Sequence, residues 1–234
     1  MPDLSEKEYL AELIRDFPTG KQIDIETAWK RIQIKYRVLD LNKENFAETV
    51  FSENRTLSEL FFLLAKSIHG FMFEGVLSNA GEFRKATDPN HGFVAFGGNL
   101  HRNPWGSKFK GSPPEQIEAG LKSAFDLLSK NDPDPVRTSI MFYQKFVHIH
   151  PFYDANGRVA RFLLTLYLLF HGYYVLWKQL EEGKKNEFLK KLNSCHLRQQ
   201  SGAYNDYLEH LYRFWKKFVV SKKSLSAENI INDF

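Results

Sequence analysis

The sequence has one cysteine and no long uninterrupted apolar run. Cys195 stands alone, which excludes an internal disulfide and a cysteine-based metal cluster and fits a reducing compartment. The longest apolar run, around residues 162–170, is interrupted by Thr165 and falls short of the roughly 20 residues that cross a bilayer. The first residues have neither the basic region nor the apolar region of a secretory signal. We therefore expect a cytoplasmic protein with no membrane partner.

Strong charge and internal repetition are also missing. The net charge of +4 is spread along the chain, and a Lys-rich stretch near the end is typical of a solvated helix terminus; it contains Lys216, Lys217, Lys222 and Lys223. We therefore expect no nucleic-acid partner. No repeat or low-complexity linker is present, and 234 residues with 43% hydrophobic content are enough for one substantial core.

Apolar spacing predicts a mainly α-helical fold. Four early helices, separated by Pro18, Gly20 and a break at Glu53-Asn54, are expected over residues 5–16, 22–36, 43–51 and 56–76. Helical spacing resumes over residues 113–129 and from residue 136 onward.

Between residues 81 and 114 the pattern changes, because glycine, proline and asparagine dominate. Residues 92–98 alternate as in a short strand, which is the one β element that the pattern predicts. Most such stretches only connect elements, although long loops in compact domains are often binding elements.

A dense polar cluster lies at a predicted helix–loop–helix junction. His150 and Asp154 belong to the loop, and Arg158 and Arg161 follow in the first turns of the next helix. A helix N-terminus carries partial positive charge and unpaired N–H donors, so cations are disfavoured there. Arg158 and Arg161 are nevertheless favourable at this position if an anion such as phosphate binds between them and the backbone donors of residues 156–158. The alternative is that both arginines are solvated or pair with surface carboxylates.

Two further groups in this loop suit phosphate chemistry. Asp154 is a hard oxygen ligand next to the expected anion, which suits Mg²⁺. His150 exchanges protons near neutral pH and is the candidate general base. Taken singly, an aspartate before Asn-Gly is commonly a turn former, and a histidine after an apolar helix is commonly a hydrogen-bonded core residue.

This segment resembles the signature of the Fic family, His-x-Phe-x-(Asp/Glu)-Gly-Asn-Gly-Arg-x-x-Arg. The matching residues are His150, Phe152, Asp154, Asn156, Gly157, Arg158 and Arg161. Ala155 departs from the pattern, since the family usually has glycine there, and alanine lacks the freedom of glycine at positive φ.

A second resemblance lies about a hundred residues upstream. Residues 49–54 fit the (Ser/Thr)-x-x-x-Glu-(Gly/Asn) motif of self-inhibited family members. The resemblance implies that Glu53 pairs with Arg161 and occupies the room of the ATP γ-phosphate, and a carboxylate is a natural substitute for phosphate on a guanidinium.

The resemblance also implies a flap and an adenine pocket. The family has a β-hairpin flap after a Gly-x-Phe-Arg segment, here residues 81–84, which would hold a target segment by strand addition. The flap residues nearest the nucleotide would be Val94, Ala95, Phe96 and Gly97. In a helix expected over residues 184–197, Phe188 falls where a stacking aromatic is typical, and His196 falls where asparagine is usual. By periodicity alone, Phe188 is a core residue.

The expected function is protein adenylylation (AMPylation), the transfer of AMP from ATP to a hydroxyl of a target protein. His150 would act as base and Asp154 would bind Mg²⁺. The amides near Ala155, Asn156 and Gly157 and the two arginines would hold the phosphates. The alternatives are transfer of UMP, phosphate or phosphocholine, removal of AMP, a nucleotide-sensing or protein-binding module without catalysis, and a metal hydrolase built on His148, His150 and Asp154. The last is weak, because residues two apart lie on different sides of a helix.

The expected fold is a Fic-like helical bundle with a short β-hairpin flap over the active-site loop. Residues 1–42 would form an N-terminal helical extension that packs on the core through apolar helix faces, and residues 43–220 would form the catalytic domain. That domain would contain an inhibitory helix over residues 43–54 and a flap over about residues 84–104, and residues 221–234 would be a tail. The expected partner is a target protein that presents a Tyr, Thr or Ser hydroxyl along the flap; self-modification and a homodimer are compatible with the sequence.

Overall fold

The computed structural model describes residues 5–51, 57–97, 109–129, 133–199 and 202–224. Over these residues the fold is mainly helical, as predicted. The principal helices are α1 (Glu6–Asp16), α2 (Ile25–Leu41), α3 (Lys43–Phe51), α4 (Leu57–Phe73), α5 (Ile117–Ser129), α6 (Pro135–Ile149), α7 (Asn156–Phe170), α9 (Lys185–Arg198) and α10 (Tyr204–Trp215). None of them combines the length and apolar character that a bilayer crossing needs.

The N-terminal helices begin at capping residues. Ser5 and Glu8 form a reciprocal capping box at the start of α1, and the Asp24 carboxylate accepts the Thr27 N–H (2.9 Å) at the start of α2. The second predicted helix therefore begins at residue 25 rather than 22, and it continues to Leu41, five residues past the predicted end.

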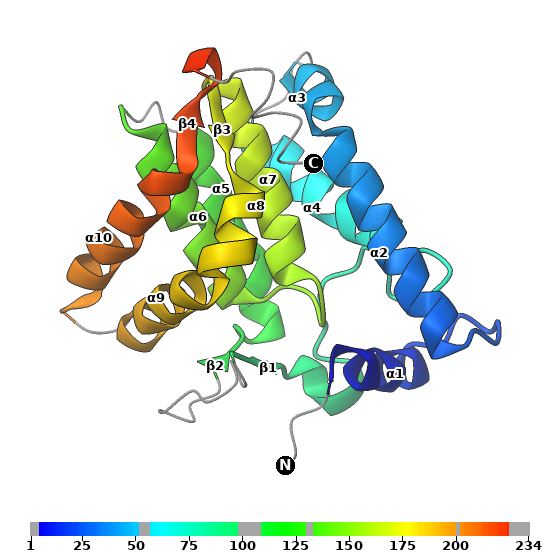
Figure 1. Ribbon diagram of the computed structural model, residues 1–234. Coiled ribbons are helices and arrows are strands. Elements are labelled where there is room, and N and C mark those ends of the chain that lie inside the picture. Colours follow the sequence, from blue (N-terminus) through cyan, green and yellow to red (C-terminus); the bar gives the residue numbers. More distant parts are fainter. Residues whose placement is uncertain (1–4, 52–56, 98–108, 130–132, 200–201, 225–234) are drawn as a thin grey trace.

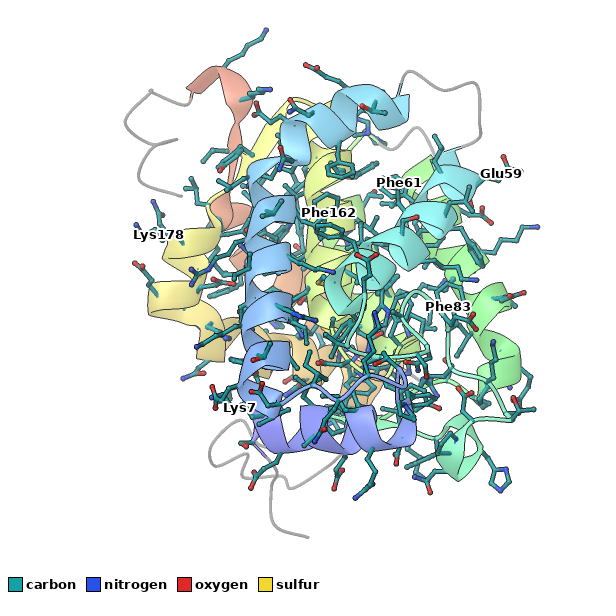
Figure 2. The ribbon with its side chains drawn as sticks, turned by 90° about the vertical axis from the view of Figure 1, so that its right-hand side faces the viewer. Lys7, Glu59, Phe61, Phe83, Phe162 and Lys178 are labelled. Carbon is teal, nitrogen blue, oxygen red and sulfur yellow. The ribbon has the colours of Figure 1, made fainter. Side chains whose placement is uncertain are left out.

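Helix α7 forms the centre of the molecule. Figure 1 shows it between α2 and α4 on one side and α9 and α10 on the other. Residues 163–168 of α7 are buried on every face and are apolar except for Thr165, which is typical of a helix segment covered on every side; the apolar residues are Leu163, Leu164, Leu166, Tyr167 and Leu168. Figure 2 shows Phe162 of α7 between α2 and α4, where its ring meets that of Phe46 from α3 edge-on (5.5 Å).

The N-terminal extension packs into the same core, as its apolar spacing predicts. Leu10 of α1 and Ile32 of α2 have no exposed surface. Figure 2 shows α1, in which Lys7 is labelled, crossing the N-terminal end of α2. The two helices therefore lie against the end of the molecule that holds the loop between α6 and α7 (Figure 1).

The predicted flap contains β1 (Ala95–Phe96), which pairs antiparallel with β2 (Phe109–Lys110), and β2 lies beyond the predicted end of the flap at about residue 104. The prediction of one β element was wrong, because β3 (Tyr173–Val175) also pairs antiparallel with β4 (Val219–Ser221). These strands are short and far apart in sequence, so neither shows the alternation by which a longer strand is recognised. Between β3 and α9 the chain forms the short helix α8 (Trp177–Gln179) and a π-helical turn, η3 (Leu180–Lys184).

Candidate active site

The polar loop joins the C-terminus of α6 to the N-terminus of α7, as predicted. His150 ends α6 in the left-handed conformation (φ 54°, ψ 59°), and Ala155 precedes α7 in the same region (φ 59°, ψ 12°). Ala155 therefore has the backbone conformation that favours glycine. Because its side chain gives no cap, the first N–H donors of α7 are left for another acceptor.

Two residues of the loop hold its shape. The Asn156 side chain accepts the Phe152 N–H (2.9 Å) and donates to the Phe152 carbonyl (2.8 Å). The Phe152 ring is fully buried and stacks on His69 of α4 at 4.1 Å. The amide side chain of Asn156 therefore closes the loop, and only its backbone N–H can serve a ligand.

Arg84 joins the loop to the flap. Its guanidinium donates to the carbonyls of His150 (2.8 Å) and Ser112 (2.9 Å) and also to that of Gly92, which precedes β1. The residue is 2% exposed, and the carbonyls at the negative end of α6 stabilise its charge. In the sequence, Arg84 was notable only as the last residue of the Gly-x-Phe-Arg pattern. In the structure, it joins the loop to the flap through hydrogen bonds to their carbonyls.

The His150 ring is held in one tautomer beneath the flap. Its Nδ1 lies 3.2 Å from the Val147 carbonyl, so Nδ1 carries the proton and Nε2 keeps the lone pair that a general base needs. The Phe96 ring of β1 stacks on the imidazole at 4.3 Å with planes 12° apart. Burial lowers the pKa of His150 to about 3.

Asp154 and Arg158 form an ion pair beside the helix N-terminus. One carboxylate oxygen accepts the Ala155 N–H (2.5 Å), and the other lies 3.2 Å from Nη2 of Arg158. Arg158 Nη1 is buried and has no hydrogen-bond partner among the described residues. A buried donor in this state indicates an acceptor that the described residues do not supply.

Arg161 has two carboxylate partners, neither of which is the predicted one. Its Nη2 lies 3.4 Å from the Asp40 carboxylate of α2, and its Nη1 contacts Glu181 of η3. The guanidinium also lies 4.3 Å from the Trp177 ring centroid. Glu53, which the motif assigned to Arg161, lies outside the described residues.

These groups line a cavity of about 1040 Å³, which is the size of a site for a nucleotide-sized ligand. The structure brings together eight of the predicted site residues on its wall: His150, Asp154, Ala155, Asn156, Gly157, Arg158, Arg161 and Phe188. The opposite wall was not predicted. It consists of residues of α1 and α2, among them Tyr9, Tyr36 and Asp40.

Five other described site residues are not among those that line this cavity, and their contact with a nucleotide stays a prediction; they are Val94, Ala95, Phe96, Gly97 and His196. Phe96 packs between His150 and His196, so the flap lies on the far side of the base. His196 is buried and bonds through Nδ1 to Gln144 (3.1 Å).

Asp154 is the carboxylate of the loop that could bind a divalent cation. Asp154 is partly exposed toward the cavity and keeps lone pairs beyond its two contacts, so its chemistry fits Mg²⁺ held jointly with phosphate oxygens. Across the described part of the chain, no three His, Cys, Asp or Glu side chains come together as a metal site, which disfavours a hydrolase built on His148, His150 and Asp154.

Comparison with known proteins agrees with the geometry. Residues 63–168 match the Fic/DOC family model. A relative named protein adenylyltransferase Fic, from Nematostella vectensis, is 30% identical over 98 residues, which are 35% of this chain and 23% of the relative. Protein adenylyltransferase fic-1 from Caenorhabditis elegans is 27% identical over 128 residues, which are 53% of this chain and 25% of the relative. The chain thus spans about a quarter of the length of these relatives.

The fold is similar to that of a solved Fic domain. The N-terminal Fic domain of a Bartonella quintana effector protein superimposes with a TM-score of 0.57 at 15% identity, covering 92% of each chain. Residues 63–168 are therefore identified as a Fic/DOC domain. The two curated relatives that are similar to this part of the chain are both named protein adenylyltransferases.

Proposed function

We propose that the protein is a protein adenylyltransferase, which transfers AMP from ATP to a hydroxyl side chain of a target protein. The observation that carries the proposal is the uncapped N-terminus of α7. His150, Asp154 and two arginines surround it in one cavity, and each arginine keeps a buried donor without a partner among the described residues. The names of the curated relatives support the same activity.

In the proposed reaction the target hydroxyl oxygen forms a bond to the α-phosphorus while the bond to the β-phosphate oxygen breaks. The hydroxyl proton passes to Nε2 of His150, and pyrophosphate leaves. The free amides at residues 156–158 stabilise charge on the α-phosphate, and Arg158 and Arg161 bind the outer phosphates. When bound, Mg²⁺ would be held by Asp154 and would neutralise phosphate charge.

The Phe96 ring covers His150, the proposed base, and this affects the proposed transfer reaction. A histidine with a pKa of about 3 accepts protons weakly at neutral pH. We propose that a target segment adding to the β1–β2 edge displaces Phe96 from the imidazole, which would return the pKa of His150 toward 6.5.

Self-inhibition is the second part of the proposal. The motif at residues 49–54 assigns the inhibitory carboxylate to Glu53, and the described carboxylates on Arg161 are Asp40 and Glu181. Glu53, or Asp40 and Glu181 together, would compete with a phosphate for the Arg161 guanidinium.

The experiment compares wild type, Glu53→Gly and the Glu53→Gly, His150→Ala double variant with Mg²⁺ and ATP labelled on the α-phosphate. Labelling of the protein by one AMP in Glu53→Gly alone would support the transfer, the base and the inhibitor. A label that survives His150→Ala would contradict the base. Binding of nucleotide without any label would indicate a different donor or a non-catalytic module.

A further inference from the structure

A tyrosine of the N-terminal extension meets both arginines of the site. The Tyr36 ring centroid lies 6.0 Å from the guanidinium carbon of Arg158 and 5.8 Å from that of Arg161. Its hydroxyl is buried and has no hydrogen-bond partner in the described part of the protein, and the residue lines the cavity. The sequence indicated Tyr36 only as part of an apolar helix face.

Three buried donors of residues that line the cavity share this state. Besides the Tyr36 hydroxyl they are Nη1 of Arg158 and Nε of Arg161, each without a partner among the described residues. A buried polar group without a partner costs about 1–3 kcal/mol, so three of them around two cations call for an external acceptor. The group that accepts from several donors at once and carries the complementary charge is an oxyanion such as a polyphosphate.

The Tyr36 hydroxyl suits this role at any physiological pH. Burial raises its pKa well above the ordinary value of a phenol, so it keeps its proton and acts as a donor. It also comes from α2, outside residues 63–168 that match the family model, so the family signature does not include it.

Resting on the proposed function, we propose that Tyr36 is a further ligand of the polyphosphate chain, donating its hydroxyl to an outer phosphate oxygen beside Arg158 and Arg161. Helix α2 would then be part of the binding site.

Asp40 lies on the same face of α2, and its substitution should change polyphosphate affinity in the opposite direction. It lies one turn after Tyr36 and places a carboxylate 3.4 Å from Nη2 of Arg161, so it competes with a bound anion. Removing the Tyr36 hydroxyl should weaken polyphosphate binding, whereas neutralising Asp40 should strengthen it. If α2 only covered the site sterically, the two substitutions would not act in opposite directions.

The experiment measures dissociation constants by titration calorimetry for inorganic tripolyphosphate, ATP and adenosine, each with Mg²⁺. The proteins are wild type, Tyr36→Phe, Asp40→Asn and the control Tyr167→Phe, which removes a fully buried hydroxyl that does not line the cavity. Tyr36→Phe should bind tripolyphosphate and ATP about 10-fold more weakly, because a hydrogen bond to a charged group is lost, and adenosine equally well. Asp40→Asn should bind both phosphates more tightly, and the control should match wild type.

Tripolyphosphate affinity of Tyr36→Phe within two-fold of wild type, or an equal loss of adenosine affinity, would overturn the assignment. A melting temperature of Tyr36→Phe at or above that of wild type would support it, since the lost hydroxyl has no partner in the described chain. Because tripolyphosphate binding needs no transfer, a Glu53→Gly variant that binds it but is never labelled by ATP would overturn the proposed function while leaving the Tyr36 assignment standing.

Discussion

Replacing Arg84 should both destabilise the protein and loosen the flap that covers His150, the proposed base. The guanidinium is 2% exposed and donates to four backbone carbonyls, those of His150, Ser112, Gly92 and Ile149. Each buried carbonyl left without a donor costs about 1–3 kcal/mol. Removing the buried charge recovers several kcal/mol of desolvation. We therefore expect Arg84→Met to lower the free energy of unfolding by about 3–5 kcal/mol, the size seen when one partner of a buried charged contact is removed.

The Arg84→Lys variant keeps the positive charge but loses the several donors by which the guanidinium binds the loop and the flap. A single ammonium donates from one point and cannot span carbonyls of both the loop and the flap, so an intermediate loss of stability is expected. With the flap loosened, the pKa of His150 should rise from about 3 toward 6.5.

Urea unfolding gives the stability, and NMR titration of the histidine rings gives the pKa. Arg213→Met is the control, because Arg213 is mostly exposed and its ion pair within the described part of the chain is with Glu209 of its own helix; it should change stability by less than about 0.5 kcal/mol. A loss below about 1 kcal/mol for Arg84→Met, or an unchanged His150 titration in Arg84→Lys, would refute the reasoning.

Three further predictions concern the loop and the buried histidines. Phe96→Ala should raise the pKa of His150 in the same NMR titration because the stacked ring is removed, whereas Phe93→Ala, on an exposed flap side chain, should not; equal titrations would contradict the covering role of Phe96. Ala155→Gly should change the free energy of unfolding by less than about 1 kcal/mol, because relief of about 1–2 kcal/mol at positive φ is offset by a lost buried methyl and by glycine entropy. The matched Ala160→Gly, in a regular helical turn, should cost more than about 1 kcal/mol in the same urea unfolding, and a similar result for both would refute the strain. Burial lowers the pKa values of His69, His150 and His196 to about 3, so their contribution to stability is complete above pH 6.5 and is lost as the pH falls from 6.5 toward 3. Each should cost about 2 kcal/mol at pH 5, measured by urea unfolding at several pH values, and a flat profile between pH 7 and 5 would contradict it.

The sequence predicted what depends on neighbouring residues. The helix periodicity, the loop between α6 and α7 and the unusual position of Ala155 all follow from short-range patterns, and the structure agrees with them. The flap was predicted through its glycine-rich composition and resemblance rather than through a strong strand signal.

The sequence did not predict contacts between distant segments. Arg161 pairs with Asp40 across 121 positions, and nothing in the local pattern of α2 distinguishes that aspartate from a solvated one. Phe96 stacks on the His150 ring, and Arg84 donates to carbonyls of both the loop and the flap; neither contact is visible in the local sequence pattern. The β3–β4 pairing likewise joins two three-residue segments that have no signal of their own.

Two separate parts of the chain line the cavity, and this affects how related proteins can diverge in sequence. The reactive loop lies inside residues 63–168, whereas Tyr9, Tyr36 and Asp40 on the facing wall come from helices that precede this segment. On the proposed function, the reacting groups and part of the ligand contacts would be encoded in separate stretches, so the N-terminal helices would be able to change without altering the proposed catalytic residues. A chimaera that joins α1 and α2 of one family member to the core of another would transfer preference for a ligand as a unit.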